Sequence, residues 1–505
     1  MSQKERVSRR PRRAEVAPTL SAGGPNDLNT APYAPVPASV PDVLVNAALE
    51  LLSTSGVAFE PGSKAIDYLR SGGCDVDPDG IVRMPRELVL KALASSAKSV
   101  ALWNRDGTHS ISLDCHHTWF IPGMTCIKVF DLETQESRDS TGDDLAMITR
   151  LADALPHIDA VCVSCKNVSR SDIHGEIEEF AILAQNTSKP LEFLCEHAAS
   201  LDVVIEMASA IRGGAELLRE KPYFLQLVTP MPLNYHAAHT DQIITAALAG
   251  VPLSVGTLPI GGASTPITTA GCMANSLATD FAAMVLAQIV KPGSFCIGSS
   301  DVCFMEPATG GIGNFAQTSM ADMVMCQVRR KLDLPSFTGA AGYSSAQHFN
   351  QDAVAEISTS LMQTFYSRPA TLDYLGSLDQ GLTFSMHALM LCDDIAGLLR
   401  TMWEGVQIDE ETLALDLAKQ VGPRGNYLAH RHTVSHCREN LWASRYFGPN
   451  MPLSGDGKPD HDLFARIDID LKSILSSHIP DPMSTALEKQ IKAIRNVFEA
   501  SFTNP

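Results

Sequence analysis

Three apolar runs, each followed by a turn-rich stretch and then by a long helical pattern, fill the interval Val251–Glu356. The apolar runs are Pro252–Ile260, Ser294–Ser299 and Pro335–Ser345. The turn-rich stretches are Gly261–Gly271, Glu306–Asn314 and Ala346–Asp352. Buried parallel strands read as continuous apolar runs, and polar residues collect where such strands end. We therefore expect parallel strands joined by helices, with the functional side chains at the carboxyl ends of the strands.

The same alternation of strand and helix patterns continues on both sides of this interval. Four further runs predict strands at Asp159–Cys165, Pro190–Cys195, Tyr223–Thr229 and Thr371–Gly376. This alternation predicts an α/β fold, a TIM (β/α)8 barrel. Seven strand–helix units are clear and an eighth is not identified. The expectation that the barrel closes therefore rests on the usual size of such barrels. A doubly wound open sheet is the alternative, and the absence of a G-x-G-x-x-G motif after a first strand weakens it.

The rest of the chain divides into three segments around this barrel. Residues 1–40 combine an arginine-rich run with a linker rich in Pro and Ala, which is typical of a disordered basic tail. Residues 41–135 predict an N-terminal α+β cap, in which helical patterns are followed by short strands at Ser99–Trp103, Ser110–Leu113, Thr118–Phe120 and Cys126–Asp131. We assign residues 136–408 to the β/α barrel and residues 409–505 to a helical C-terminal extension.

Composition limits the partners and the compartment. The formal net charge of −18 argues against nucleic acid as the main partner. No apolar core of a signal peptide follows the N-terminal arginines, and the longest apolar helical pattern, Phe281–Val290, is too short to cross a membrane. Twelve cysteines scattered through a long chain indicate reduced thiols, so we expect a cytoplasmic protein without membrane contact.

The sequence lacks the motifs of the common hydrolytic and phosphoryl-transfer enzymes, namely G-x-S-x-G, the Walker loop and H-E-x-x-H. Aromatic and acidic residues gather instead near the predicted strand ends. The candidates for substrate binding are Glu196, Tyr235, Tyr343, Phe349 and Tyr374. Each ring taken singly is better explained by core packing. Taken together, rings that converge with a carboxylate indicate a site for a cation, quaternary ammonium above all.

The C-terminal string GNYLAHRHTVSHCREN contains His432, His436 and Glu439, which would share one face of a helix. Histidine and carboxylate side chains can hold zinc. A polar helical segment packed on the barrel or on a partner subunit explains the string more simply, so we predict no metal site.

Several long strings resemble one family, the trimethylamine–corrinoid protein methyltransferases, in the branch that lacks pyrrolysine. The strings are STSGVAFEPGSKAIDYLRSGGCDVD, IVRMPRELV, WNRDG, TGDDLAMITRLADALPHID, PLSVGTLPIGGASTPITTAGCMANSLATDFAAMVLAQIVKPGS and NYLAHRHT. The resemblance implies a TIM barrel that moves a methyl group from a methylated amine to the Co(I) of a separate corrinoid protein. It also implies that this chain binds no cofactor tightly, because the partner supplies the corrinoid (cobalamin).

The string SSAQHFNQDAVAE resembles the loop of this family in which the trimethylamine enzymes carry pyrrolysine. Its positions that fit the family pattern are Ser344, Ala346, Ala353 and Glu356. Other positions depart from the pattern, and no pyrrolysine is present. Within this loop we predict His348, Asn350 and Asp352 as the catalytic groups that orient the substrate. Glu356 lies one helical turn after Asp352 and has either the same role or a structural one.

Without pyrrolysine, the resemblance favours a small quaternary amine such as a betaine as the substrate. Two alternatives stay open. One is a demethylase of a sulfonium compound, and the other is a non-catalytic betaine-binding or corrinoid-docking relative, which the altered loop would permit. The apolar barrel helices and the long helical tail also indicate self-association into a homo-oligomer.

Overall fold

The computed structural model describes residues 31–299, 301–313, 315–339, 341–437, 441–448 and 462–502. At its centre lies a parallel sheet with the strand order β6-β18-β17-β14-β12-β10-β9. The bounds are β6 (Trp119–Pro122), β9 (Leu191–Leu194), β10 (Phe224–Val228), β12 (Leu253–Val255), β14 (Cys296–Ser299), β17 (Ser336–Thr338) and β18 (Thr371–Leu375). Every neighbouring pair in this order is parallel, as the sequence predicts.

An extended segment, residues 159–165, closes the sheet into a barrel between β9 and β6. On one side Val161 bridges Leu191 in the parallel sense. On the other side the Asp159 amide donates to the Phe120 carbonyl at 2.9 Å, and Cys126 bridges Cys165. With this segment, the seven strands of the sheet become the eight extended segments of a barrel, and the TIM-barrel expectation is confirmed. One barrel strand is β6, where the sequence predicted a short strand at Thr118–Phe120 but assigned it to the cap of residues 41–135.

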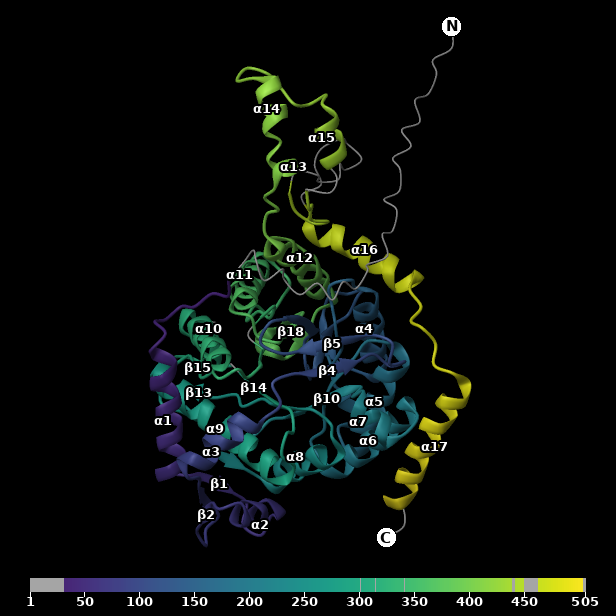
Figure 1. Ribbon diagram of the computed structural model, residues 1–505. Helices are drawn as coiled ribbons and strands as arrows, with labels where there is room; N and C mark the ends of the chain where they lie inside the picture. Colours follow the sequence, from purple (N-terminus) through teal and green to yellow (C-terminus); the bar gives the residue numbers. More distant parts are fainter. Residues whose placement is uncertain are drawn as a thin grey trace.

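Eight long helices surround the strands (Figure 1). They are α4 (Gly142–Ala154), α5 (Ile173–Asn186), α6 (Ala198–Arg212), α8 (Ala237–Ala249), α9 (Thr269–Val290), α10 (Ala316–Lys331), α11 (Gln351–Ser367) and α12 (Met386–Glu404), with a short α7 (Ala215–Glu220) after α6. Local sequence sets several ends. Asp172 caps α5 by accepting from the Gly175 amide, and Gly250 ends α8 with a φ of 78°.

Helix α9 is longer than the apolar stretch Phe281–Val290 that the sequence indicated. By length and composition its 22 residues could cross a membrane, yet 83% of its most apolar window is buried inside the protein. The helices that pack against it are α1 (Val40–Thr54), α2 (Lys64–Ser71), α3 (Arg86–Ser95), α8 and α10. It is therefore a core helix of the folded chain.

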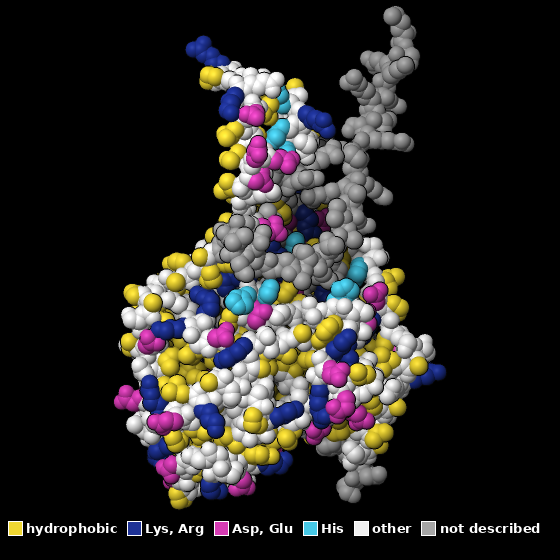
Figure 2. Space-filling model, in the orientation of Figure 1, with side chains coloured by type: hydrophobic (Ala, Val, Ile, Leu, Met, Phe, Trp, Pro, Cys, Tyr) yellow, Lys and Arg dark blue, Asp and Glu magenta, His cyan; other side chains and the backbone are white. Residues whose placement is uncertain are grey.

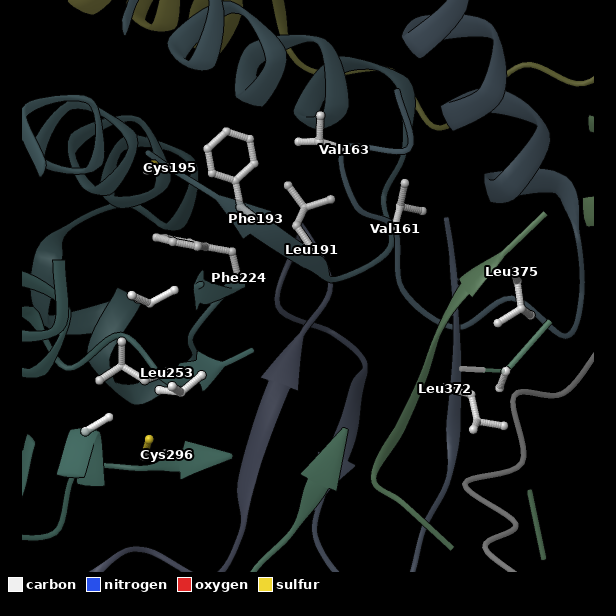
Figure 3. Close-up of a cluster of buried hydrophobic side chains, with 14 of the residues drawn as sticks. Val161, Val163, Leu191, Phe193, Cys195, Phe224, Leu253, Cys296, Leu372 and Leu375 are labelled. Carbon is white, nitrogen blue, oxygen red and sulfur yellow. The ribbon is translucent and has the colours of Figure 1, made fainter. Parts of the chain in front are cut away.

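Alternate side chains of the strands point to the helices and to the barrel interior. Leu191, Phe193, Phe224 and Leu253 belong to the large cluster between strands and helices (Figure 3). A second cluster fills the lower interior with Leu225, Ile297 and other residues of the strands' inward faces. The hairpin β4 (Val100–Trp103) and β5 (Ser110–Leu113) adds Leu102 and Leu113 to it, and so closes the amino-terminal end of the barrel.

The N-terminal elements cover α9 and the adjoining strand ends. They are α1 (Val40–Thr54), β1 (Val57–Phe59), α2 (Lys64–Ser71), β2 (Asp75–Val76), β3 (Ile81–Arg83) and α3 (Arg86–Ser95). Strand β1 pairs in parallel with the short β11 (Asn234–Tyr235), which joins this layer to the barrel.

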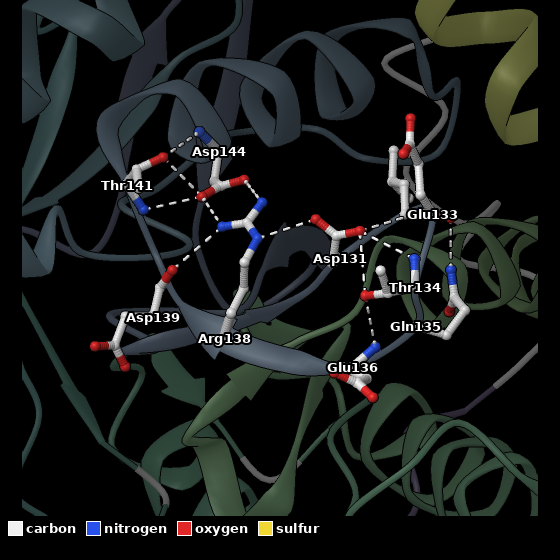
Figure 4. Close-up of polar contacts among 10 residues, drawn as sticks. Asp131, Glu133, Thr134, Gln135, Glu136, Arg138, Asp139, Thr141 and Asp144 are labelled. Atoms are coloured by element: carbon white, nitrogen blue, oxygen red, sulfur yellow. Dashed lines mark hydrogen bonds and ion pairs between the residues drawn. The ribbon is translucent and has the colours of Figure 1, made fainter.

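Short strands decorate the carboxyl ends of the barrel strands. One set is β13 (Ile260–Gly261), β15 (Cys303–Met305) and β16 (Ile312–Gly313), and the other is β7 (Lys128–Phe130), β8 (Ser137–Asp139), β19 (Ser377–Leu378) and β20 (Thr383–Phe384). Arg138 of β8 ties its hairpin to α4 (Figure 4), since it donates to both oxygens of Asp144 at 2.7 and 2.8 Å and to Asp131 at 3.1 Å.

The last part of the chain is helical where it is described. Helices α13 (Glu410–Leu413), α14 (Leu415–Val421) and α15 (Arg431–His436) project from the barrel, and α16 (Leu463–Ser477) and α17 (Thr485–Phe502) run down one side of it (Figure 1). Charged and histidine side chains gather on the projecting helices (Figure 2). His432 and His436 stack at 4.4 Å, but Glu439 lies outside the described residues. Within those residues, no group of three or more His, Cys, Asp or Glu could hold a metal ion.

One expected strand is much shorter than the sequence suggested. Of the run Pro335–Ser345, only Ser336–Thr338 forms a strand, and the chain then turns into an irregular loop up to α11. Four residues beyond the strand, Gly342 has a φ of 75°, which is not extended, and its amide donates to the Ser360 hydroxyl rather than to a strand.

Candidate active site

A small pocket of about 80 Å³ opens where β14, β17 and β18 end. Its lining residues come from β18, from the segments that follow β12, β14, β17 and β18, and from α10: Leu258, Asp301, Val302, Cys303, Ile312, Thr318, Gly339, Tyr343, Tyr374, Gln380 and Gly381. In a β/α barrel the carboxyl ends of the strands carry the chemistry. The volume is several times that needed for one water, so the pocket suits a small ligand.

Tyr374 reaches this pocket through an unusual backbone. Its φ is +70°, and the pairing of β18 with β6 shifts register between Leu372 and Leu375. A non-glycine residue with positive φ is uncommon, and such strain clusters at functional sites. Gly339 makes room for the ring, because a Cβ at that position would lie 2.5 Å from two ring carbons of Tyr374. A bulge and a glycine therefore set the place of this ring.

Asp301 is the carboxylate of the pocket, and β17 holds it in place. Its Oδ1 accepts from the Thr338 hydroxyl at 2.9 Å and from the Gly339 amide at 2.6 Å. Its own amide donates to the Ser299 hydroxyl at 2.9 Å. The residue is 8% exposed, so its charge faces a largely dry site.

Two more carboxyl groups lie inside the barrel. Glu192 of β9 and Asp373 of β18 are fully buried, and the two oxygens of Glu192 and Oδ1 of Asp373 have no hydrogen-bond partner among the described residues. Burial, with the Asp301 carboxylate adding to it, raises the pKa of Glu192 to about 8. Burial also raises the pKa of Asp373 well above its ordinary value, and Glu192 and Asp301 raise it further. A cation brought close to this set would be strongly favoured.

Helix α10 contributes a polar wall. The Thr318 hydroxyl is buried at the pocket and has no hydrogen-bond partner among the described residues. Asp322 lies one turn further along and is fully buried, and burial together with the Asp301 charge raises its pKa. Tyr343 completes the wall with a ring that is 9% exposed.

A strained loop forms part of the rim. Asp379, Gln380 and Gly381 all have positive φ, and Gln380 Oε1 accepts from the Ile312 amide at 3.3 Å. Neighbouring backbone bonds, such as Ser344 N–H to the Ser377 carbonyl at 2.9 Å, fasten this loop to the segment before α11.

Of the substrate-binding residues predicted from sequence, Tyr343 and Tyr374 meet in this pocket. Tyr235 does not line it. It is buried against Phe59 and donates to the Thr279 carbonyl. Phe349 packs near His387 and Phe464, away from the pocket lining. Glu196 has a side chain that is 61% exposed and lies 3.9 Å from Lys166.

The predicted catalytic residues do not line the pocket either. Asn350 caps α11, since its side-chain oxygen accepts from the Asp352 and Ala353 amides. Asp352 is exposed in the first turn of that helix, and His348 is exposed beside Phe130. Their catalytic role stays a prediction. Glu356 accepts from Ser344 and Ser345, which is a structural task.

The sequence analysis missed the carboxyl groups of the site. A signal was present, because Glu192 and Asp373 interrupt the otherwise apolar strings LEFL and TLDYL. A charge inside a buried strand needs a reason. Asp301 lies between the predicted strand Ser294–Ser299 and the turn-rich stretch Glu306–Asn314, and no pattern in the sequence singled out its carboxylate.

Comparison with known proteins identifies the family of the chain. Residues 2–496 match the family described as trimethylamine methyltransferase (MTTB). The chain is 27% identical to the trimethylamine methyltransferase MttB of Desulfitobacterium hafniense (strain DSM 10664 / DCB-2), over 88% of this chain and 90% of that protein. It is 22% identical to a glycine betaine methyltransferase of Desulfitobacterium hafniense (strain Y51), over 88% and 93% of the two chains.

Among solved structures, the hydroxylamine complex of MtmB superposes with a TM-score of 0.51 over 91% of both chains, at 12% identity. This supports the fold. The match over nearly the whole sequence gives the family, and the chain belongs to the trimethylamine methyltransferase (MTTB) family.

Proposed function

We propose that this methyltransferase takes a methyl group from a small methylated cation bound between Tyr343 and Tyr374 and passes it to the Co(I) of a separate corrinoid protein. The observation that carries the proposal is the pocket itself. Two aromatic rings and the Asp301 carboxylate converge at the catalytic end of the barrel, in a chain whose relatives are methyltransferases.

The rings and the carboxylate suit a methylated onium group. Aromatic faces attract such a group by about 2 kcal/mol each when water is excluded. Asp301 adds a full opposite charge, held by two hydrogen bonds so that it does not reorganise. The pocket thereby holds the cation in one place and keeps water from the methyl group to be transferred.

The chain needs no nucleophile of its own for this reaction. A quaternary nitrogen keeps the electron pair of the broken C–N bond and leaves as a neutral tertiary amine, so no proton has to be supplied. The reduced cobalt of the corrinoid supplies the nucleophile. The protein orients the methyl group of the substrate and leaves the mouth of the pocket open to the corrinoid partner.

The rim fits a broad apolar partner group such as the face of a corrin. Leu258, which lines the pocket, is 46% exposed, and Ile127 and Leu382 are 46% and 48% exposed. The Ile127 amide donates to the Leu382 carbonyl, so these two side chains belong to one part of the rim. Exposed apolar groups around a functional pocket are typical of a docking surface.

The direct test is methylation of added Co(I) cobalamin by the purified full-length chain, followed by its absorbance change over a panel of methylated amines. At least one cation should methylate cobalamin, and Tyr374→Leu should slow the reaction at subsaturating substrate by tenfold or more. If no member of the panel supports transfer, or if Tyr374→Leu reacts at the wild-type rate, the proposed function is wrong.

A further inference from the structure

After α12 the chain leaves the barrel and forms a projection (Figure 1). We call residues 405–437 the arm, and they contain α13, α14 and α15. These helices have only 4, 7 and 6 residues, and none of them contains a buried residue. Isolated helices shorter than about 12 residues are marginal in water unless they pack against other structure. The arm therefore has little core of its own to stabilise it.

The arm exposes large apolar side chains along its length. Leu428 is 83% exposed and Ile408 is 76% exposed. The other apolar side chains of the arm that are more than half exposed are Val406, Leu413, Leu415 and Val434. Single exposed apolar residues are normal, but a group of them on one projection is typical of a surface that another molecule covers.

The arm starts at the amino-terminal end of the barrel. Near the end of α12, the guanidinium carbon of Arg368 lies 4.1 Å from the centre of the Trp403 ring. Arg368 also donates to the carbonyl of His116, just before β6 begins. Helix α12 thus ends beside the amino-terminal ends of the strands, as a crossover helix between parallel strands does. A corrinoid partner at the mouth, which is the other end of the barrel, does not explain the apolar surface of the arm.

The net charge of the arm differs from that of the whole chain. The chain has a formal net charge of −18, so two copies repel each other over most of their surfaces. Residues 405–437 contain four Asp or Glu and three Lys or Arg, so their charges nearly balance. Two copies can therefore approach through the arm with little net repulsion.

The two signs of charge lie on different helices of the arm. A hollow of about 710 Å³ is lined by acids of α13 and α14 and by cationic and histidine residues at the start of α15. Figure 2 shows the acidic and the histidine side chains next to each other on the arm. Glu411 lies 3.6 Å from His436, whereas the exposed Glu410 and Arg431 have no ion pair with another described residue. The arm thus presents one available charge of each sign.

We propose that the arm is the surface through which two copies of this chain associate, with its apolar side chains buried between the two arms and α13 of one copy facing α15 of the other. A surface with both signs on separate helices is complementary to itself after a two-fold rotation. The rotation pairs Glu410 of each copy with Arg431 of the other and closes the contact at two arms. A partner of a single sign would suit only one of the two helices.

Sedimentation velocity of the full-length chain tests the apolar part of this interface. Leu428→Asp changes an exposed side chain, and it should halve the mass of the particle, because each contact between arms joins two copies. Ile479→Asp is the matched control, since Ile479 is 84% exposed, lies outside the arm and receives the same substitution. The control should keep the wild-type mass, and circular dichroism confirms that both variants are folded. A wild-type chain that is monomeric at micromolar concentration, or equal masses of the two variants, overturns the inference.

Charge reversal tests whether one arm meets another arm. Glu410→Arg puts a cation at both positions of the pair, and Arg431→Glu puts an anion at both. Each variant alone should lose tenfold or more in association affinity, because like charges then face each other twice. An equal mixture of the two variants should associate as the wild type does, since both contacts again join opposite charges. A mixture that associates no better than the separate variants overturns the inference.

Methyl transfer to Co(I) cobalamin separates this inference from the proposed function. A halved mass of Leu428→Asp supports the inference even where no cation gives transfer by the wild-type chain, a result that would overturn only the proposed function. An unchanged mass with transfer slowed tenfold or more would mean that the arm serves the cobalamin side of the reaction, and it overturns the inference.

Discussion

At the scale of single residues, the site combines buried carboxyl groups with oxygens left unpartnered in the described part of the chain, a strained backbone and a glycine that leaves space for a ring. Glu192 is buried with no hydrogen-bond partner among the described residues, and Asp373 is buried with a bond from the Thr371 hydroxyl to one of its two oxygens. Tyr374 has a positive φ, and Gly339 has no side chain. Each of these features costs folding free energy, and such costs are typical of functional sites.

Gly339→Ala tests the position of the Tyr374 ring. The added methyl would lie 2.5 Å from the ring, so the ring must move. We expect cation affinity to fall by tenfold or more with little change in the midpoint of thermal unfolding. In a Tyr374→Leu background the same substitution should cost much less, because the clash is gone. Additive losses in this double-mutant cycle would show that Gly339 acts by another route.

The buried carboxyl of Glu192 predicts how stability depends on pH. With a folded pKa of about 8 against about 4.3 for an ordinary glutamate, the native state holds one more proton than the unfolded state between these values. Stability should therefore fall as pH rises from 6.5 to 8. Glu192→Gln should flatten this slope in thermal melts, and saturating cation should restore stability at pH 8. An unchanged slope in the variant would contradict the assignment.

At the scale of elements, the site lies at the ends of barrel strands, and hydrogen bonds and ion pairs hold the neighbouring elements in place. Burial by itself would raise the pKa of Asp144, but its bonds from Arg138 and Thr141 outweigh it and lower that pKa. Through Arg138, Asp144 joins β8 to the first turn of α4, and with Thr141 it forms a capping box.

Asp144→Ala should therefore lower the free energy of unfolding by roughly 2–4 kcal/mol, since it removes a cap and leaves Arg138 without its bidentate partner. Asp139→Ala, at the neighbouring exposed position of β8, is the control and should change stability by less than about 0.5 kcal/mol. Chemical denaturation measures both. Similar effects of the two substitutions would mean that the tie to α4 contributes little.

Sequence patterns predicted the helices and most barrel strands, because buried elements carry long and regular patterns of apolar residues. They predicted a short strand at Thr118–Phe120 but placed it in the cap, so β6 was not recognised as a barrel strand, because its four residues stand among short strands and lack a long apolar run. They overestimated the run after Pro335, because an apolar loop that packs under a pocket looks like a strand. Tyr343 and Tyr374 were found through their ring chemistry. Asp301 and Glu192 were not found in this way. Whether a carboxylate points into the barrel or toward the helices depends on the register of its strand, which the sequence pattern did not give.

At the scale of the whole molecule, the barrel separates two tasks. Its amino-terminal end is closed by the β4–β5 hairpin and carries apolar packing, and its carboxyl end carries the acids, the rings and an apolar rim. The cap and the C-terminal helices cover the sides, so the mouth is where a partner protein would meet the substrate.

The proposed function requires a methylated cation to bind between Tyr343 and Tyr374, beside Asp301. Crystals soaked with trimethylselenonium, an onium ion with an anomalous scatterer, would locate that cation directly. The account predicts a selenium peak in this pocket that disappears in Asp301→Asn crystals soaked at the same concentration. A peak elsewhere in the wild-type protein, with this pocket filled only by solvent, would contradict it.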